Sequence, residues 1–175
     1  AGVQCAEDMM SKLDTADIVI LDQPIINSIT QRVQGFQDTI KNNKNYRVVI
    51  QEAARGELEI AMEVMNRIIE SGISFDVVLG GNDPTALGAL AALESHHKTE
   101  DILIYGVDGS PDGKMMIKEG YLEGTSAQYP SNMGKIAAEV AYAYLYGERV
   151  EENIVVPVTL ITKENLNDFA IDEWQ

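Results

Sequence analysis

Short apolar runs alternate along this chain with longer stretches of helical periodicity. The runs share the length and the Val and Ile content of buried parallel strands. They lie at residues 17–21, 47–50, 76–79, 102–107, 123–127 and 154–158, the last two being weaker. Between them, apolar residues recur at helical spacing, as in Ile29, Val33, Phe36 and Ile40. This alternation predicts an α/β fold, in which a parallel sheet carries helices on both faces.

Proline marks the expected starts of three helices. Asp83-Pro84 places a capping carboxylate before a proline at the first helical position. Ser110-Pro111 and Pro130-Ser131 indicate two further starts. Because a proline at the first turn sacrifices no intrahelical hydrogen bond, these pairs favour helix entry directly after a strand.

Composition sets limits on the class of protein. Apolar residues make up 45% of the 175 residues and charged residues 23%, which is typical of a chain with a packed core. The formal net charge of −15 repels phosphate backbones, so we expect no nucleic-acid binding through this segment. The single cysteine, Cys5, permits no intramolecular disulfide and is expected to pack as a small apolar residue. The apolar runs are too short for a transmembrane helix.

Polar side chains follow each of the first five predicted strands. In open α/β sheets, ligands bind at the carboxyl ends of the strands. The residues expected at that edge are Arg32, Arg55, Asn82, Asp108 and Gln128. Arginine donates hydrogen bonds, aspartate accepts them, and the two amides do both. This set favours a neutral polyhydroxylated ligand over a catalytic task.

Other interpretations of these residues remain open. Asn82 and Asp83 are also typical of helix caps, and Asp108 before Gly109 is typical of a turn. Phosphate-binding glycine loops, zinc-protease motifs and nucleophile elbows are missing from the sequence. The adjacent histidines at 96–97 fit favourable placement at a helix end. We therefore expect no enzyme activity and no cofactor.

One segment resembles a calcium-binding loop. Asp108, Asp112 and Glu119 stand near the spacing of a twelve-residue loop of that kind. The real motif follows a helix, whereas residues 102–107 predict a strand, and Pro111 restricts the loop backbone. We expect a strand–turn–helix element here and no metal.

Several segments together resemble the type I periplasmic sugar-binding proteins, and in particular the ribose-binding subfamily. They are Gln-Arg-Val-Gln-Gly-Phe at 31–36, Phe-Asp-Val-Val-Leu-Gly-Gly-Asn-Asp-Pro-Thr-Ala-Leu-Gly-Ala-Leu at 75–90, Ile-Tyr-Gly-Val-Asp-Gly-Ser-Pro-Asp at 104–112, Gly-Thr-Ser-Ala-Gln-Tyr-Pro at 124–130, and the apolar residues of 156–162. The resemblance covers nearly all of the chain in order. It is the combination that is specific, since each segment alone is common.

The resemblance implies a fold of two α/β lobes, joined by three crossovers, that closes on a ligand by a hinge motion. It implies that Arg32, Asn82, Asp108 and Gln128 contact sugar hydroxyls. A membrane permease or a receptor would then recognise the closed form. The implied location is extracytoplasmic, in the periplasm or as a cell-surface lipoprotein.

The sequence departs from the family pattern in two places. Where the family usually has an aromatic residue to stack on the sugar, this chain has Arg55-Gly56, and Arg55 is the residue there that would meet an acidic or modified ligand. Most of the first lobe is also missing, so the chain is expected to be a fragment. Residues 1–128 would form the C-terminal ligand-binding lobe, 129–157 a crossover and helix of the other lobe, and 158–175 a terminal crossover strand and tail.

Two functions are compatible with this resemblance. The first is the solute-binding component of an ABC transport or sensing system for a sugar or polyol. The alternative is the effector-binding core of a sugar-responsive transcription repressor of the LacI type, which would be cytoplasmic. The segment 107–112 is more similar to the transport proteins.

The helix expected at 131–147 carries an apolar stripe. Its large members are Met133, Ile136, Val140, Tyr144 and Leu145. In the complete fold this face would pack on the first lobe, which is missing here. We expect that the fragment self-associates through residues 131–147, or that this helix detaches and docks on a neighbouring chain; the alternative is that the helix folds back onto residues 1–128.

Overall fold

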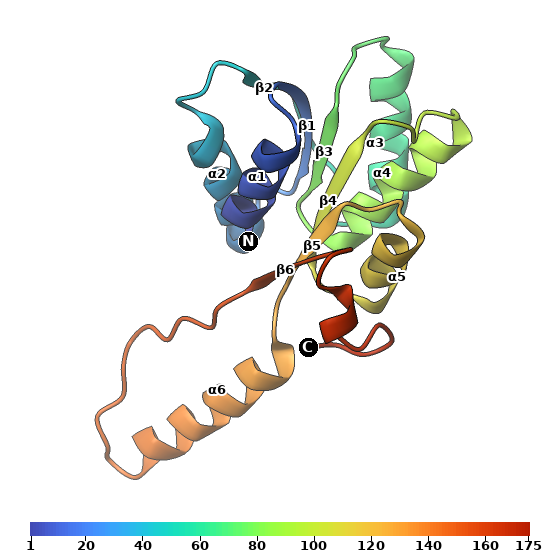
Figure 1. Ribbon diagram of the computed structural model, residues 1–175. Coiled ribbons are helices and arrows are strands. Elements are labelled where there is room, and N and C mark those ends of the chain that lie inside the picture. The colour runs from blue at the N-terminus through green and yellow to red at the C-terminus, as the bar shows by residue number, and fades with distance from the viewer.

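The computed structural model describes residues 1–175, in which strands and helices alternate (Figure 1). In chain order the elements are α1 (Gly2–Lys12), β1 (Ala16–Asp22), α2 (Asn27–Ile40), β2 (Tyr46–Ala53), α3 (Leu58–Glu70), β3 (Val77–Gly80), α4 (Asp83–Ser95), β4 (Leu103–Asp108), α5 (Pro111–Glu119), β5 (Gly124–Ala127), α6 (Pro130–Leu145), β6 (Thr159–Thr162) and the 3₁₀ helix η1 (Leu166–Asp168).

The strands form one sheet in the order β2-β1-β3-β4-β5-β6. The pairs from β2 to β5 are parallel, and β6 adds to β5 in the antiparallel direction. The predicted parallel sheet with helices on both faces is therefore confirmed. The strand order reverses between β1 and β3, and such a switch point opens a crevice at the carboxyl ends of the strands.

Helices α1 and α2 cover one face of the sheet. All four residues of the α2 stripe predicted at 29, 33, 36 and 40 are buried there, against β-strand residues that include Ile18, Ile20 and Tyr105. Cys5 of α1 is fully buried in the same cluster, as expected. Burial raises the pKa of its thiol to about 12, so the sulfur remains protonated and unreactive at neutral pH.

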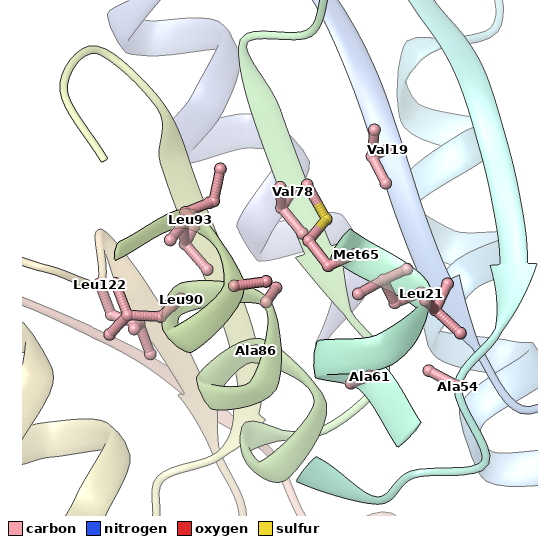
Figure 2. Close-up of a cluster of buried hydrophobic side chains, with 14 of the residues drawn as sticks. Val19, Leu21, Ala54, Ala61, Met65, Val78, Ala86, Leu90, Leu93 and Leu122 are labelled. Carbon is pink, nitrogen blue, oxygen red and sulfur yellow. The ribbon is translucent and has the colours of Figure 1, made fainter. Parts of the chain in front are cut away.

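Helices α3 and α4 cover the opposite face. Figure 2 shows Met65 of α3 with Val78 of β3, and Leu90 and Leu93 along α4. The two helices pack closely because α4 has a glycine at the contact. A Cβ atom at Gly88 would lie 2.2 Å from the carbonyl oxygen of Leu58. The lobe therefore has two apolar layers, one on each face of the sheet.

The prediction of a strand at residues 154–158 is wrong. These residues form no strand, and the last strand is β6, Thr159–Thr162. The ladder between β5 and β6 ends at the pair Ala127–Thr159, so the residues before 159 have no neighbouring strand to pair with. Pro157 also lacks the N–H group that a ladder needs.

Helix α6 extends away from the sheet, and Figure 1 shows it apart from the other helices. None of its residues is buried. The alternative that this helix folds back onto residues 1–128 is therefore wrong. The chain returns from α6 along its apolar face, where Val150, Ile154 and Val156 line one cavity together with Ile136 and Val140. No helix in the structure combines the length and the hydropathy that a membrane span requires.

Candidate functional site

Asp108, at the end of β4, lies at the centre of a polar cluster on the carboxyl edge of the sheet. Its Oδ1 atom accepts a 2.8 Å hydrogen bond from Nε2 of Gln128, which follows β5. The same oxygen lies 3.5 Å from Nη1 of Arg32. The Arg32 and Asp108 side chains are only 15% and 19% exposed, so the pair is largely buried but still reached by solvent. The structure thus brings together three of the five residues predicted at this edge.

Arg32 reaches this cluster from α2, the helix that follows β1. Its Nη1 atom donates a 2.8 Å hydrogen bond to the carbonyl oxygen of Gly81, in the loop that leads from β3 into α4. This contact crosses the switch point between β1 and β3. Since the guanidinium is held at both Gly81 and Asp108, its remaining N–H donors have fixed directions.

Asn82 is the N-cap of α4. Its Oδ1 atom accepts hydrogen bonds from the backbone N–H of Thr85 at 3.0 Å and from the Thr85 hydroxyl at 2.5 Å. Its Nδ2 atom donates to the carbonyl oxygen of Gly56 at 3.0 Å. The capping interpretation of Asn82 is therefore confirmed, and the amide also fastens the loop after β2. Asn82 directly follows Gly81, whose carbonyl oxygen accepts the hydrogen bond from Arg32.

Arg55 is exposed and makes no hydrogen bond or ion pair with Arg32, Asp108 or Gln128. It forms no ion pair in the structure, although its neighbour Gly56 is held by Asn82. Its backbone has a φ of 56°, in the left-handed region that costs a side-chain-bearing residue free energy.

Asp83 was predicted as a helix cap, and this prediction is wrong. The cap is Asn82, and Asp83 turns inward, where it is fully buried. Its Oδ1 atom accepts a 2.6 Å hydrogen bond from the Thr125 hydroxyl, and its Oδ2 atom accepts one at 2.8 Å from the backbone N–H of Ser110. Thr125 in turn accepts from the backbone N–H of Gly109 at 3.0 Å. The carboxylate therefore holds the loop that presents Asp108.

The sequence offers little to distinguish this role from capping. An Asp-Pro pair after a strand fits both, and the partners of Asp83 lie 27 and 42 residues away. The two glycines that make room for the carboxylate, Gly106 of β4 and Gly113 of α5, are also distant from Asp83 in the sequence.

The surroundings of Asp108 disfavour the ionised form of its carboxyl group. Burial raises the pKa of Asp108 to about 6, the Asp83 carboxylate contributes in the same direction, and the Arg32 guanidinium opposes both. The backbone of Asp108 has a φ of 141°, a value that glycine adopts more readily. A strained and partly desolvated acceptor is typical of a binding residue, which gains its full set of donors when a ligand arrives.

The strand–turn–helix interpretation of the calcium-like segment is confirmed. β4 precedes it, and Ser110 caps α5 by accepting a 3.0 Å hydrogen bond from the N–H of Gly113. Asp112 lies exposed in the first turn of α5. Asp108 is instead directed to Arg32 and Gln128. The structure contains no group of three or more His, Cys, Asp and Glu side chains arranged to hold a metal ion.

The chain is similar to several proteins with curated descriptions. The chain is 34% identical to the ribose import binding protein of Salmonella typhimurium over 134 residues, which are 77% of this chain and 45% of that protein. It is 33% identical to the xylitol-binding protein of Mycolicibacterium smegmatis over 175 residues, which are 98% of this chain and 50% of that protein. The chain thus spans about half the length of the curated relatives that it matches.

A solved structure has the same fold. An ABC transporter solute binding protein from Bacillus halodurans, with bound myo-inositol, superposes with a TM-score of 0.91 at 30% identity, covering 96% of this chain and 59% of that one. The profile of the family described as periplasmic binding protein domain matches residues 1–149. The chain therefore belongs to the periplasmic binding protein domain family, within its type I sugar-binding group.

Proposed function

We propose that this chain forms the ligand-binding lobe of a non-enzymatic solute-binding component, which takes up a sugar or related polyol for an ABC transport or sensing system. The observation that carries the proposal is the cluster of Arg32, Asp108 and Gln128 at the carboxyl edge of the sheet. A cation and an amide both approach the same carboxylate oxygen of Asp108, and each of the three side chains keeps capacity for further bonds.

The chemistry of the cluster fits neutral hydroxyl groups. A hydroxyl donates to Asp108 and accepts from Arg32 or Gln128, so adjacent hydroxyls on one ring satisfy all three side chains. The Nδ2 atom of Asn82 has a second hydrogen, which extends the set along the same edge. Arg55 lies after β2 at this edge, and we assign it to contact with an acidic or modified ligand rather than with a neutral sugar.

The named relatives favour transport over the repressor alternative. They include import binding proteins and a polyol-binding protein, and the named ligands are ribose, xylitol and myo-inositol. All three are neutral and polyhydroxylated. On this proposal the partners are the ligand and a membrane permease or receptor, and the location is extracytoplasmic.

Titration calorimetry on the complete protein that carries this chain tests the proposal. The probes are D-ribose, xylitol and myo-inositol. The Asp108→Ala variant should bind the best of them about ten- to a hundredfold more weakly, since hydrogen bonds to charged groups contribute about 1.5–3 kcal/mol. Asp112→Ala is the matched control, because Asp112 is an exposed aspartate four residues away. Unchanged affinity in Asp108→Ala, or equal losses in the two variants, would remove Asp108 from the site.

We further propose a division of the chain in which residues 1–128 form the binding lobe, 129–157 contribute to a second lobe, and 158–175 return to the first. The exposed apolar face of α6 supports this division, because nothing in residues 1–128 covers it. In the 175-residue chain by itself, we assign that face to a second copy of the chain. The cavity along it measures about 520 Å³, and nine of its eleven lining residues are hydrophobic.

A further inference from the structure

A second cavity, of about 410 Å³, adjoins the Arg32–Asp108–Gln128 cluster. Asp108 and Gln128 line it together with Pro130 and Met133 at the start of α6 and with Trp174 from the C-terminal tail. Figure 1 shows the C-terminus beside the first turn of α6, at the edge of the sheet where β5 ends. A residue at the far end of the sequence is therefore part of the wall around two predicted ligand contacts. The volume is within the range of small-molecule sites.

The tail that carries Trp174 is firmly held. Leu166 of η1 is buried in the core, where η1 packs against α5, and Phe169 and Ile171 pack against the same core. Lys114 of α5 is fully buried, and its Nζ atom donates hydrogen bonds to the carbonyl oxygens of Ala170 and Glu173. Lys114 thus fixes the residue directly before Trp174.

Trp174 brings to this edge an apolar surface that the polar residues lack. None of the five predicted site residues is aromatic. Trp174 is 53% exposed although the residue before it is held, so a large rigid aromatic side chain is partly available for contact. Pyranose and cyclitol rings present C–H groups on their faces and hydroxyls at their rims, so a site for them needs an apolar surface beside its polar groups.

We propose that Trp174 is a ligand-contacting, specificity-determining residue of this site. Its indole packs on the C–H face of the sugar or polyol that Asp108 and Gln128 bind. Lys114 is the positioning residue that holds Trp174 there. This inference rests on the proposed function. It assigns to the C-terminal tail a part of the binding surface, and it selects cyclic ligands, which have an extended C–H face, over open-chain polyols.

The test compares variants of the complete protein by calorimetry with myo-inositol, D-ribose and xylitol. Trp174→Leu should weaken binding of the preferred cyclic probe about three- to tenfold, the range expected for loss of an aromatic contact. Trp174→Phe should restore most of the affinity, because it keeps a flat ring. Lys114→Met should reproduce the effect of Trp174→Leu by releasing the tail. Tyr121→Leu is the matched control, since Tyr121 is 44% exposed and lies near the start of β5, at the other end of the strand.

A second readout uses the 175-residue chain, in which Trp174 is the only tryptophan. Adding the probe that binds should change the emission of Trp174, and Asp108→Ala should move that change to higher probe concentration. Unchanged affinity in Trp174→Leu, with a loss in Asp108→Ala, overturns this inference and leaves the proposed function intact. Failure of all three probes to bind overturns both. A loss in Trp174→Leu that Trp174→Phe does not restore, with unaltered emission, assigns Trp174 to stability alone and also overturns the inference.

Discussion

The carboxylate of Asp83 accepts a 2.6 Å hydrogen bond from the hydroxyl of Thr125 in the interior of the lobe, with both side chains fully buried. The surrounding backbone is shaped around this carboxylate. A Cβ atom at Gly106 would lie 2.2 Å from Oδ1 of Asp83, and one at Gly113 would lie 2.6 Å from Oδ2. Two strands and the loop after β4 therefore depend on one acidic side chain, which sets where Asp108 lies.

Replacing Asp83 should destabilise the lobe. Asp83→Ala leaves the Thr125 hydroxyl and the Ser110 N–H without their acceptor, and each unsatisfied buried donor costs about 1–3 kcal/mol. We expect the free energy of unfolding to fall by roughly 3 kcal/mol in total, measured by urea denaturation. Asp112→Ala, at an exposed position, should change it by less than about 0.5 kcal/mol. Equal stability of the two variants would mean that Asp83 does not hold the loop.

Asp108 should make the stability of the lobe depend on pH. Its pKa of about 6 in the folded state lies above the ordinary value of 3.8, so the folded state binds more protons than the unfolded state between these two pH values. The free energy of unfolding therefore falls as pH rises from about 4 to about 6, by at most about 3 kcal/mol. Asp108→Asn removes this titration. Its stability relative to the natural protein should increase over that pH range and stay constant above it.

Ligand affinity should change with pH in the opposite direction. A hydroxyl donates best to an ionised Asp108, so the affinity for a neutral sugar should decrease as pH falls below about 6. Neutral sugars do not titrate in this range, which leaves the change to the protein. Calorimetry at a series of pH values measures it. An affinity that is constant from pH 7 to about 5 would show that the ionised form of Asp108 is not required.

The sequence predicts the sheet, the stripes of the helices and the edge where polar residues gather, because these depend on local periodicity and on the rule that ligands bind at strand ends. It does not predict what depends on distant partners. The runs at 47–50 and 154–158 have similar content, but only the first has a neighbouring strand. By residue type, Asp83 and Asn82 are equally suitable helix caps. Asp83 instead points into the interior because it accepts hydrogen bonds from β5 and from the loop after β4.

The part that the C-terminal tail plays at the site is likewise not predictable from local sequence, because it depends on distant partners. Arg32, Asp108 and Gln128 each follow a strand and are found by their position, whereas the role of Lys114 depends on carbonyl groups 56 and 59 residues away, and Trp174 meets the site only in the folded chain. A lone lysine early in a helix indicates nothing by itself. Its complete burial and its two carbonyl partners are visible only in the folded chain.

Calcium should not affect stability, despite the spacing of the acidic residues after β4. The Asp108 carboxylate faces Arg32 and Gln128, and Asp112 lies in the first turn of α5 and exposed to solvent. A calcium loop needs its carboxylates to converge on one point. The melting temperature should therefore be the same with added calcium and with a chelator, measured by calorimetry. A calcium-dependent rise that Asp112→Ala abolishes would show that a metal site forms at this loop.

The exposed face of α6 should cause the 175-residue chain to self-associate. Met133 is 46% exposed and Tyr144 is 70% exposed, and the returning residues 150–156 cover the face only in part. Leu145, predicted in the same stripe, is exposed and does not line the cavity. Each large apolar side chain left in water forgoes about 1.5–3 kcal/mol, which is an upper value because unfolded chains already hide some surface. Several together are comparable to the stability of a domain, about 5–15 kcal/mol.

Light scattering at tens of micromolar distinguishes the outcomes for α6. We expect a dimer or larger assembly for the natural sequence and a monomer for Met133→Lys combined with Val140→Lys, because two charges on the cavity-lining face prevent its burial. Tyr142→Lys combined with Tyr146→Lys is the matched control, since these tyrosines are 65% and 81% exposed and do not line the cavity. The control should assemble as the natural chain does, and circular dichroism should show residues 1–128 folded in both. A monomeric natural chain with α6 helical would contradict association through this face, and an assembly that only the tyrosine pair dissolves would place the contact on the opposite side of the helix.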